Sequence, residues 1–183
     1  MIKLTTPISN EEIKNLRIGD VVALTGTIFT ARDAAHARLV ELVKNQLPLP
    51  FNPKNAIVYY VGPTPPKPGQ VIGSCGPTSS YRMDPYSSVL MKEGLKIMIG
   101  KGQRSEEFKA EMRKCQGVYL SAIGGTGALI SKTVVQAVLI AYPDLGPEGI
   151  YQLTVKDFPA VVTYDAVGGD LFQEGQKKYR RSN

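Results

Sequence analysis

The amino-acid sequence predicts a single α/β domain in which helices flank a mixed, largely parallel sheet. Runs rich in β-branched residues alternate with amphipathic stretches, which is the pattern of strands and helices that alternate along the chain. Gly and Pro mark almost every junction, and 183 residues suit one compact core. We therefore expect residues 1–183 to form one domain.

The first elements follow from local signals. Ser9 and Glu12 have the spacing of a capping box and open a short helix that ends near Leu16. The run 20–30 is rich in β-branched side chains and is interrupted by Gly26. This composition predicts a strand pair or a bent strand.

The middle of the chain continues the alternation. Residues 31–46 carry apolar side chains at helical spacing, which predicts a helix, and the composition of 56–61 predicts a strand. Four prolines within 62–69 make a stiff, extended connector. The remaining expected elements are strands over 71–73, 95–99, 118–123, 151–155 and 161–167, helices over 84–92, 105–114 and 130–142, and a polar C-terminal helix.

Charge and side-chain inventory narrow the possible functions. Lys and Arg number 22 against 16 Asp and Glu, but the one dense basic run is 177–181, which is typical of a solvated helix end and not of a nucleic-acid site. No apolar run reaches the length of a membrane span, and the start lacks a signal-peptide core, so we expect a cytoplasmic protein. Cys75, Cys115 and His36 are too few to build a metal centre.

Familiar catalytic motifs are absent. The glycine-rich segment 124–127 resembles a dinucleotide fingerprint, but Ile130 stands where the third glycine belongs. Segment 100–102 lacks the hydroxyl residue that follows Lys in a phosphate loop. His36 lies inside an expected helix with no neighbouring nucleophile, which favours a structural role.

A basic side chain recurs where expected strands end. Arg32 follows the strand that ends at residue 30, Arg82 follows a Gly-Pro-Thr turn, and Lys101 follows the strand 95–99. Carboxyl ends of strands in an α/β sheet converge on one crevice, where three cations could clamp a dianion. If 78–82 forms a helical turn, the Thr78 hydroxyl shares a face with Arg82. On this pattern alone, the alternative is that the three are unrelated cations on the surface and do not form a shared site.

Three segments then occur in a recognisable order. They are 25–36, with Thr-Gly-Thr-Ile followed by Ala-Arg-Asp-Ala-Ala-His; 76–84, Gly-Pro-Thr-Ser-Ser-Tyr-Arg-Met-Asp; and 100–102, Gly-Lys-Gly. Together they resemble the iron–sulfur hydro-lyases, namely the β subunit or C-terminal domain of class I fumarase and of L(+)-tartrate dehydratase. The resemblance covers nearly the whole chain, and 76–84 is its most specific element.

This resemblance implies a swivelling β/β/α domain and a [4Fe–4S] cluster held by cysteines of a partner α subunit or N-terminal domain, not by this chain. It implies that Thr78 matches the family's catalytic threonine. Arg32, Arg82 and Lys101 match residues that bind substrate carboxylate and hydroxyl groups. Tyr81 is bulky where relatives often have a small residue, so the shape of the pocket and the substrate preference do not carry over from those relatives.

The function expected from the resemblance is reversible hydration of fumarate to malate, a step of the tricarboxylic acid cycle, in a site shared with the cluster-bearing subunit. Alternatives are the β subunit of L(+)-tartrate dehydratase and a non-catalytic assembly module. We expect a hetero-oligomer, or a homo-oligomer when the chain is isolated, that binds a dicarboxylate but no nucleic acid and no membrane. Thr78 is expected to act only when the partner closes the crevice, since its hydroxyl is a very weak acid in water.

Overall fold

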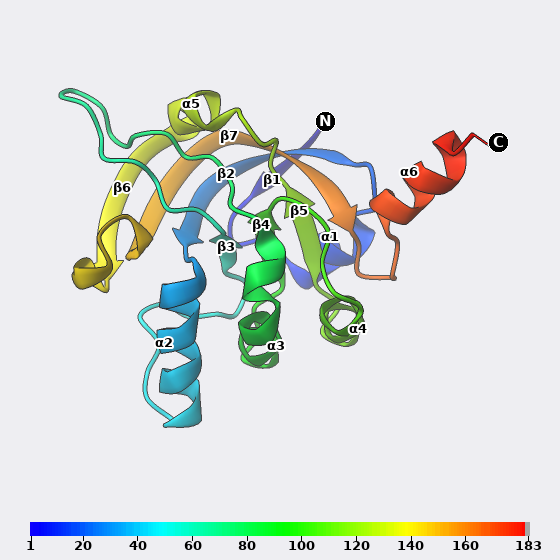
Figure 1. Ribbon diagram of the computed structural model, residues 1–183, viewed down its shortest axis with the longest axis horizontal. Coiled ribbons are helices and arrows are strands. Elements are labelled where there is room, and N and C mark those ends of the chain that lie inside the picture. The colour runs from blue at the N-terminus through cyan, green and yellow to red at the C-terminus, as the bar shows by residue number, and fades with distance from the viewer. Residues whose placement is uncertain (182–183) are drawn as a thin grey trace.

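The computed structural model describes residues 1–181, and these contain a seven-stranded sheet with the order β1-β2-β3-β4-β5-β7-β6 (Figure 1). The strands are β1 (Ile2–Thr5), β2 (Val21–Thr30), β3 (Ile57–Tyr59), β4 (Ile97–Gly100), β5 (Val118–Ser121), β6 (Val134–Ala141) and β7 (Ile150–Tyr164). Strands β1 to β5 are parallel neighbours, whereas β7 runs antiparallel to β2, β5 and β6. The sheet is therefore mixed, as predicted.

The long strand β7 closes the sheet on itself. It pairs with β6 over Ile150 to Val155, with β2 from Gln152 to Val161, and with β5 from Val161 to its end at Tyr164. Because β7 contacts both β2 and β5, the strands β2, β3, β4, β5 and β7 form a closed ring, and β7 arches over the parallel strands in Figure 1.

Two apolar cores lie on the two faces of the parallel strands. Along β3, Ile57 and Tyr59 belong to the core enclosed by the strands, whereas Val58 and the following Tyr60 belong to the core beneath the helices. Side chains alternate between faces along a strand, so a strand covered on both faces must be apolar throughout. This explains the continuous apolar runs of the parallel strands in the sequence.

Three helices cover the outer face of the parallel strands. Helices α2 (Asp33–Lys44), α3 (Asp84–Lys92) and α4 (Glu106–Lys114) lie side by side in Figure 1. The other helical segments are α1 (Asn10–Asn15), α5 (Gly127–Ile130), α6 (Leu171–Tyr179) and the 3-10 turns η1 (Ser80–Met83), η2 (Ser131–Thr133) and η3 (Pro143–Glu148). The predicted fold class, an α/β domain with a mixed sheet flanked by helices, is confirmed. Within residues 1–181, no helix has both the length and the apolar character to cross a membrane.

The helix predicted over 130–142 is wrong, because most of this segment is strand β6. Its apolar run contains several β-branched residues, and a run of this length fits a strand as well as a helix. Pairing with β7, for example Val134 with Val155, decides between them. Because β6 lies at the edge of the sheet, Val135 and Val138 remain exposed.

The predicted break between strands 151–155 and 161–167 is also absent, since β7 is continuous. A bulge absorbs the irregular segment: Asp157 adopts a left-handed φ of 53°, and its N–H donates to Thr25 Oγ1 at 3.1 Å. The short strand predicted over 71–73 does not form. There the chain packs against its own connector, where the Thr64 N–H donates to the Ser74 carbonyl at 3.0 Å.

Candidate functional site

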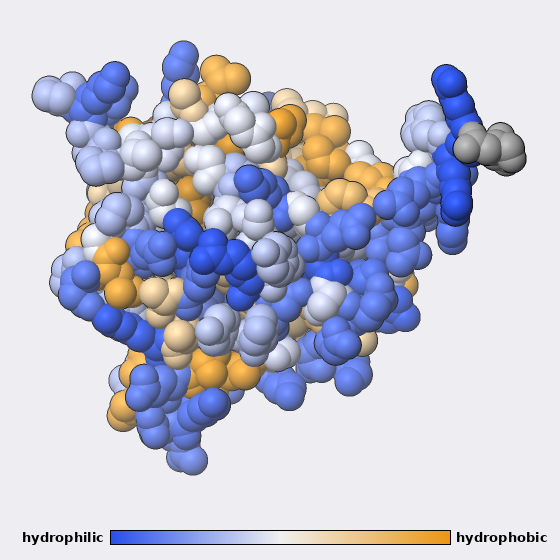
Figure 2. Space-filling view, viewed as in Figure 1, coloured by the Kyte–Doolittle hydropathy of each residue, from blue (hydrophilic) through white to orange (hydrophobic). Residues whose placement is uncertain are grey.

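The carboxyl ends of β2, β3 and β4 lie at one edge of the sheet. The register pairs Thr30 of β2 with Tyr59 of β3, and Tyr59 with Ile99 of β4. Arg32 and Lys101, which follow β2 and β4, therefore emerge at the same edge, as the sequence predicts. Figure 2 shows strongly hydrophilic side chains in the middle of the face above these strand ends.

Thr78 returns to this edge from the long connector that follows β3. Its N–H donates to the carbonyl of Tyr60 at 2.9 Å, which places Thr78 beside the end of β3. The helical turn considered over 78–82 does not form at Thr78, because Ser79 is extended and the 3-10 turn η1 begins only at Ser80. Thr78 and Ser79 are instead bound to the sheet edge, and Ser79 bridges to Lys101.

Ser80 locks the Thr78 segment to the Lys101 segment. The Lys101 N–H donates to Ser80 Oγ at 2.9 Å, and the Ser80 N–H donates to the Lys101 carbonyl at 3.0 Å. This close approach requires glycine at position 100, because a Cβ there would lie 1.9 Å from Ser80 Oγ and 2.9 Å from the Tyr60 ring. The structure thus holds Thr78 and Lys101 on adjoining segments.

A single carboxylate brings the two arginines together. Asp33 forms an ion pair with Arg82, and its other oxygen lies 3.7 Å from Nε of Arg32. Nη1 of Arg32 also lies 3.2 Å from the Glu148 carboxylate. The Arg32 side chain is 23% exposed and that of Arg82 is 45% exposed, so both side chains are partly open to solvent, although Nε of Arg32 is buried.

The site keeps an excess of positive charge. Asp33 and Glu148 offset two of the three cations, and Lys101 has no carboxylate within ion-pair distance among residues 1–181. Arg82 contacts Asp33 through Nη2, and the described part of the chain places no other carboxylate within ion-pair distance of Arg82. Because guanidinium presents five donors in a fixed fork, Arg82 retains donors for an added anion.

His36 contacts the backbone of Arg32, but its ring is buried and is not part of the cation cluster. Its ring is fully buried, and Nδ1–H donates to the Arg32 carbonyl at 2.9 Å. The ring packs edge-on against Tyr60 with centroids 5.3 Å apart. Burial lowers the pKa of His36 to about 4, so the imidazole is neutral near pH 7. The structure therefore agrees with the predicted structural role.

The thiols of this chain do not fit an iron–sulfur cluster. Cluster ligands are thiolates, whereas burial raises the pKa of Cys75 to about 12, and Cys115 lies apart from it at the C-cap of α4. Among residues 1–181, no group of three His, Cys, Asp or Glu side chains converges as metal ligands would. We therefore assign no cluster-binding role to these residues.

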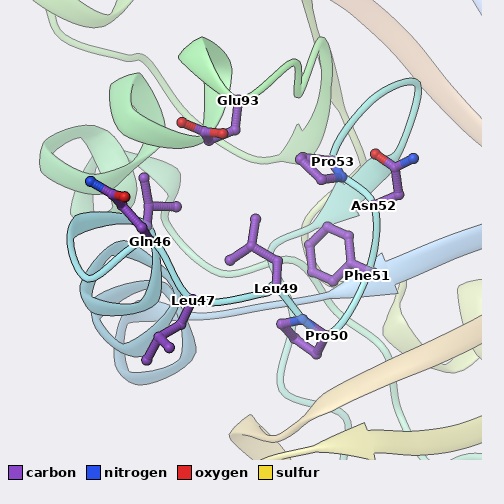
Figure 3. Close-up of a pocket in the computed structure, with 9 residues that line it drawn as sticks. Gln46, Leu47, Leu49, Pro50, Phe51, Asn52, Pro53 and Glu93 are labelled. Atoms are coloured by element: carbon purple, nitrogen blue, oxygen red, sulfur yellow. The ribbon is translucent and has the colours of Figure 1, made fainter.

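A separate concave surface lies at the other end of α2 and plays no part in this site (Figure 3). It has a volume of about 690 Å³ and is lined by Leu49, Phe51 and other residues of the loop that follows α2. Glu93 supplies the one ionisable side chain among the described residues that line it. The strand-end cations define the candidate site, and this hollow, which contains none of them, does not.

Sequence reasoning missed several residues of the site. Asp33 could have been found, because it directly follows Arg32 within the segment that carries the resemblance. Ser80 likewise lies between Thr78 and Arg82. Glu148 carries no local signal, since only the folded chain brings it within 3.2 Å of Arg32.

Fold and site together define an α/β domain that presents a cluster of cationic side chains at the carboxyl ends of its parallel strands. The chain belongs to the family described as "Fumarase C-terminus", whose model matches residues 1–175. This membership confirms the family that the sequence segments indicate.

Relatives fall into two groups by length. The chain is 36% identical over 177 residues to fumarate hydratase 2 of Leishmania major, which covers 94% of this chain and 31% of that protein. It is 41% identical over 155 residues to the anaerobic class I fumarate hydratase of Escherichia coli, covering 84% and 28%. A Methanocaldococcus jannaschii protein, provisionally named L(+)-tartrate dehydratase subunit beta, is 34% identical over 183 residues, covering 96% and 94%. The chain thus spans about a third of the fumarate hydratases and nearly all of the last relative.

Proposed function

We propose that this chain is the carboxylate-binding part of a hydro-lyase that hydrates fumarate reversibly to malate, in a site shared with a cluster-bearing partner subunit. The observation that carries the proposal is the junction of Thr78 and Lys101, bonded through Ser80, at the sheet edge from which Arg32 and Arg82 project. Fumarate hydratases of two organisms are relatives of this chain, which supports the choice of reaction.

The cations account for substrate binding and for part of the rate. Arg32, Arg82 and Lys101 would hold the two carboxylates of the substrate. Hydration places negative charge on a carboxylate as the proton is exchanged at the adjacent carbon, and fixed cations stabilise charge that grows in the transition state. Lys101 and the unused donors of Arg82 are the groups available for this task.

Thr78 would take up the proton from the substrate carbon when malate is dehydrated and return it when fumarate is hydrated. A threonine hydroxyl in water is far too weak an acid to act as a base near pH 7, so its alkoxide needs neighbouring cations and exclusion of water. Thr78 is half-buried in this chain, and its closure by a partner surface would complete such an environment.

A partner subunit that carries the cluster is part of the same proposal. The [4Fe–4S] cluster implied by the family resemblance would reside on the partner, because Cys75 and Cys115 do not fit it. The name of the Methanocaldococcus jannaschii relative, a subunit beta, supports a hetero-oligomer. A cytoplasmic location stays a prediction.

The second candidate function is L(+)-tartrate dehydration. The observation in its favour is that the relative bearing this name is matched over 94% of its own length. Tartrate differs in its hydroxyl pattern, and exposed Tyr81 next to Arg82 is one residue of this chain that could bear on the choice. A pure assembly role would require neither Thr78 nor the cations, which speaks against it.

The test is reconstitution with a cluster-bearing partner, followed by assays on fumarate, malate and tartrate. We expect fumarate and malate to interconvert, and Thr78→Ala to reduce kcat by about 10³-fold, within the range of general acid–base catalysis. Thr78→Ser keeps the hydroxyl and serves as the matched control. Turnover of tartrate alone would favour the second candidate, and near-wild-type activity of Thr78→Ala would refute the base role.

A further inference from the structure

A buried arginine lies three residues after Lys101. The Arg104 side chain is 0% exposed, its Nε donates to the Asp84 carboxylate at 2.5 Å, and its Nη2 donates to Ser87 Oγ at 3.3 Å. The second Asp84 oxygen accepts the N–H of Ser105 at 2.7 Å. A buried charge is costly, and an apolar residue of similar size often serves stability equally well, so its presence calls for another reason.

Aromatic rings enclose the Arg104 guanidinium. Its Cζ lies 3.5 Å from the ring centroid of Phe108, 5.0 Å from that of Tyr119 and 5.2 Å from that of Tyr60. Nη1 has no hydrogen-bond acceptor within residues 1–181, which leaves cation–π contact as its compensation. Burial opposes the charge, but the Tyr60 and Asp84 neighbours outweigh it and raise the pKa of Arg104, so the group stays cationic.

Three partners of Arg104, namely Asp84, Tyr60 and Tyr119, belong to or contact a segment that carries a residue of the site. Asp84 begins α3 two residues after Arg82. The carbonyl of Tyr60 accepts the Thr78 N–H at 2.9 Å.

The third partner reaches the segment of Lys101. The Tyr119 hydroxyl donates to the carbonyl of Gly102 at 3.3 Å, one residue after Lys101. Arg104 itself continues that segment, and its N–H donates to the Tyr164 hydroxyl at 3.1 Å. One guanidinium therefore contacts Asp84 directly and reaches the Thr78 and Lys101 segments through the Tyr60 and Tyr119 side chains.

We propose that Arg104 is a positioning residue that fixes the placement of Thr78, Arg82 and Lys101 relative to one another. It does not touch the substrate, because its side chain is fully enclosed. Its planar fork reaches Asp84 and Ser87 together while its face covers Phe108, a geometry that the point charge of lysine cannot reproduce. The inference deepens the proposed function and rests on it for the catalytic readout only.

The test compares Arg104→Met, which keeps the volume and loses the fork, with Arg104→Lys, which keeps the charge. Ile13→Ala, a core variant in α1 away from the strand-end cluster, controls for general loss of stability. The first readout is amide hydrogen exchange in this chain at Thr78, Ser80 and Lys101. Exchange there should accelerate about tenfold or more in Arg104→Met relative to the control, because local opening is governed by local contacts.

The second readout is kinetics with the partner present. Misplacement of binding groups by about 1 Å can lower the rate by about 10²-fold, so kcat/KM of Arg104→Met should fall by about that factor, with partial recovery in Arg104→Lys.

Exchange rates that match those of Ile13→Ala would overturn the inference, whatever the activity. If wild-type chain and partner turn over no dicarboxylate, the proposed function fails, while the exchange data still decide the role of Arg104. Should Arg104→Met not fold, Asp84→Asn breaks the same ion pair and is judged by the same two outcomes.

Discussion

The buried His36 predicts a steep loss of stability in mild acid. The imidazole lies beneath Arg32 and is packed against the Tyr60 and Tyr86 rings. Burial is the main cause that lowers the pKa of His36 from 6.5 to about 4; the charge of Arg104 lowers it further, while the Arg32 carbonyl and Asp33 oppose the shift.

The sign follows from proton linkage. Between pH 6.5 and 4, the unfolded chain binds a proton at His36 that the folded chain does not, so the free energy of unfolding falls as the pH falls. Above pH 6.5 the contribution is fully present. Because one pKa unit corresponds to about 1.4 kcal/mol, the loss relative to pH 7 is about 2 kcal/mol at pH 5 and about 3 kcal/mol at pH 4.

The assay is urea unfolding of the wild type and of His36→Phe at pH values from 4 to 8. Phe keeps the aromatic packing, and the Arg32 carbonyl still accepts the backbone N–H of residue 36, which lies at 2.8 Å. Carboxylate titration is common to both proteins and cancels in their difference, leaving the His36 contribution alone. Parallel pH profiles of the two proteins between pH 7 and 4 would refute the assignment of His36 as a buried neutral imidazole.

Three further outcomes follow from individual contacts. Gly100→Ala should lower the free energy of unfolding by about 1–3 kcal/mol, because its Cβ would lie 1.9 Å from Ser80 Oγ; a wild-type urea midpoint would contradict this. Tyr59→Phe removes the donor to the buried Cys75 carbonyl at 2.5 Å and should cost about 1–3 kcal/mol by the same measurement, whereas no loss would show that another donor replaces it. Arg82→Gln should raise KM for the dicarboxylate about 10²-fold in the reconstituted enzyme, and an unchanged KM would remove Arg82 from the binding site.

Local signals predict the elements behind the site well. The sequence predicts helices over 84–92 and 105–114, and the structure has Asp84–Lys92 and Glu106–Lys114. The Ser105 hydroxyl accepts the N–H of Phe108 at 3.1 Å, as expected of an N-cap residue. Caps, turn glycines and helical periodicity are properties of a few neighbouring residues, so they can be recognised without knowledge of the fold.

Long-range pairing explains what the sequence could not predict. Strand β6 forms because β7 is available to pair with it, and the bulge at Asp157 depends on Thr25, 132 residues away. The position of Thr78 likewise depends on Tyr60, and not on helical periodicity towards Arg82. Convergence of the cations at one edge was predictable from parallel topology, whereas the pairing of Glu148 with Arg32 was not.

Under the proposed function, the charge of the site gives a reason to expect a second surface. A dicarboxylate brings two negative charges, but Asp33 and Glu148 already offset two of the three cations, so this chain alone does not balance the ligand. Water also screens the exposed Arg82, which weakens each remaining attraction. A partner that excludes water would strengthen the interactions of Lys101 and Arg82 and would supply the environment that Thr78 needs as a base. On this proposal, binding strength and proton transfer depend on the same closure, and we expect neither at full strength in the isolated chain.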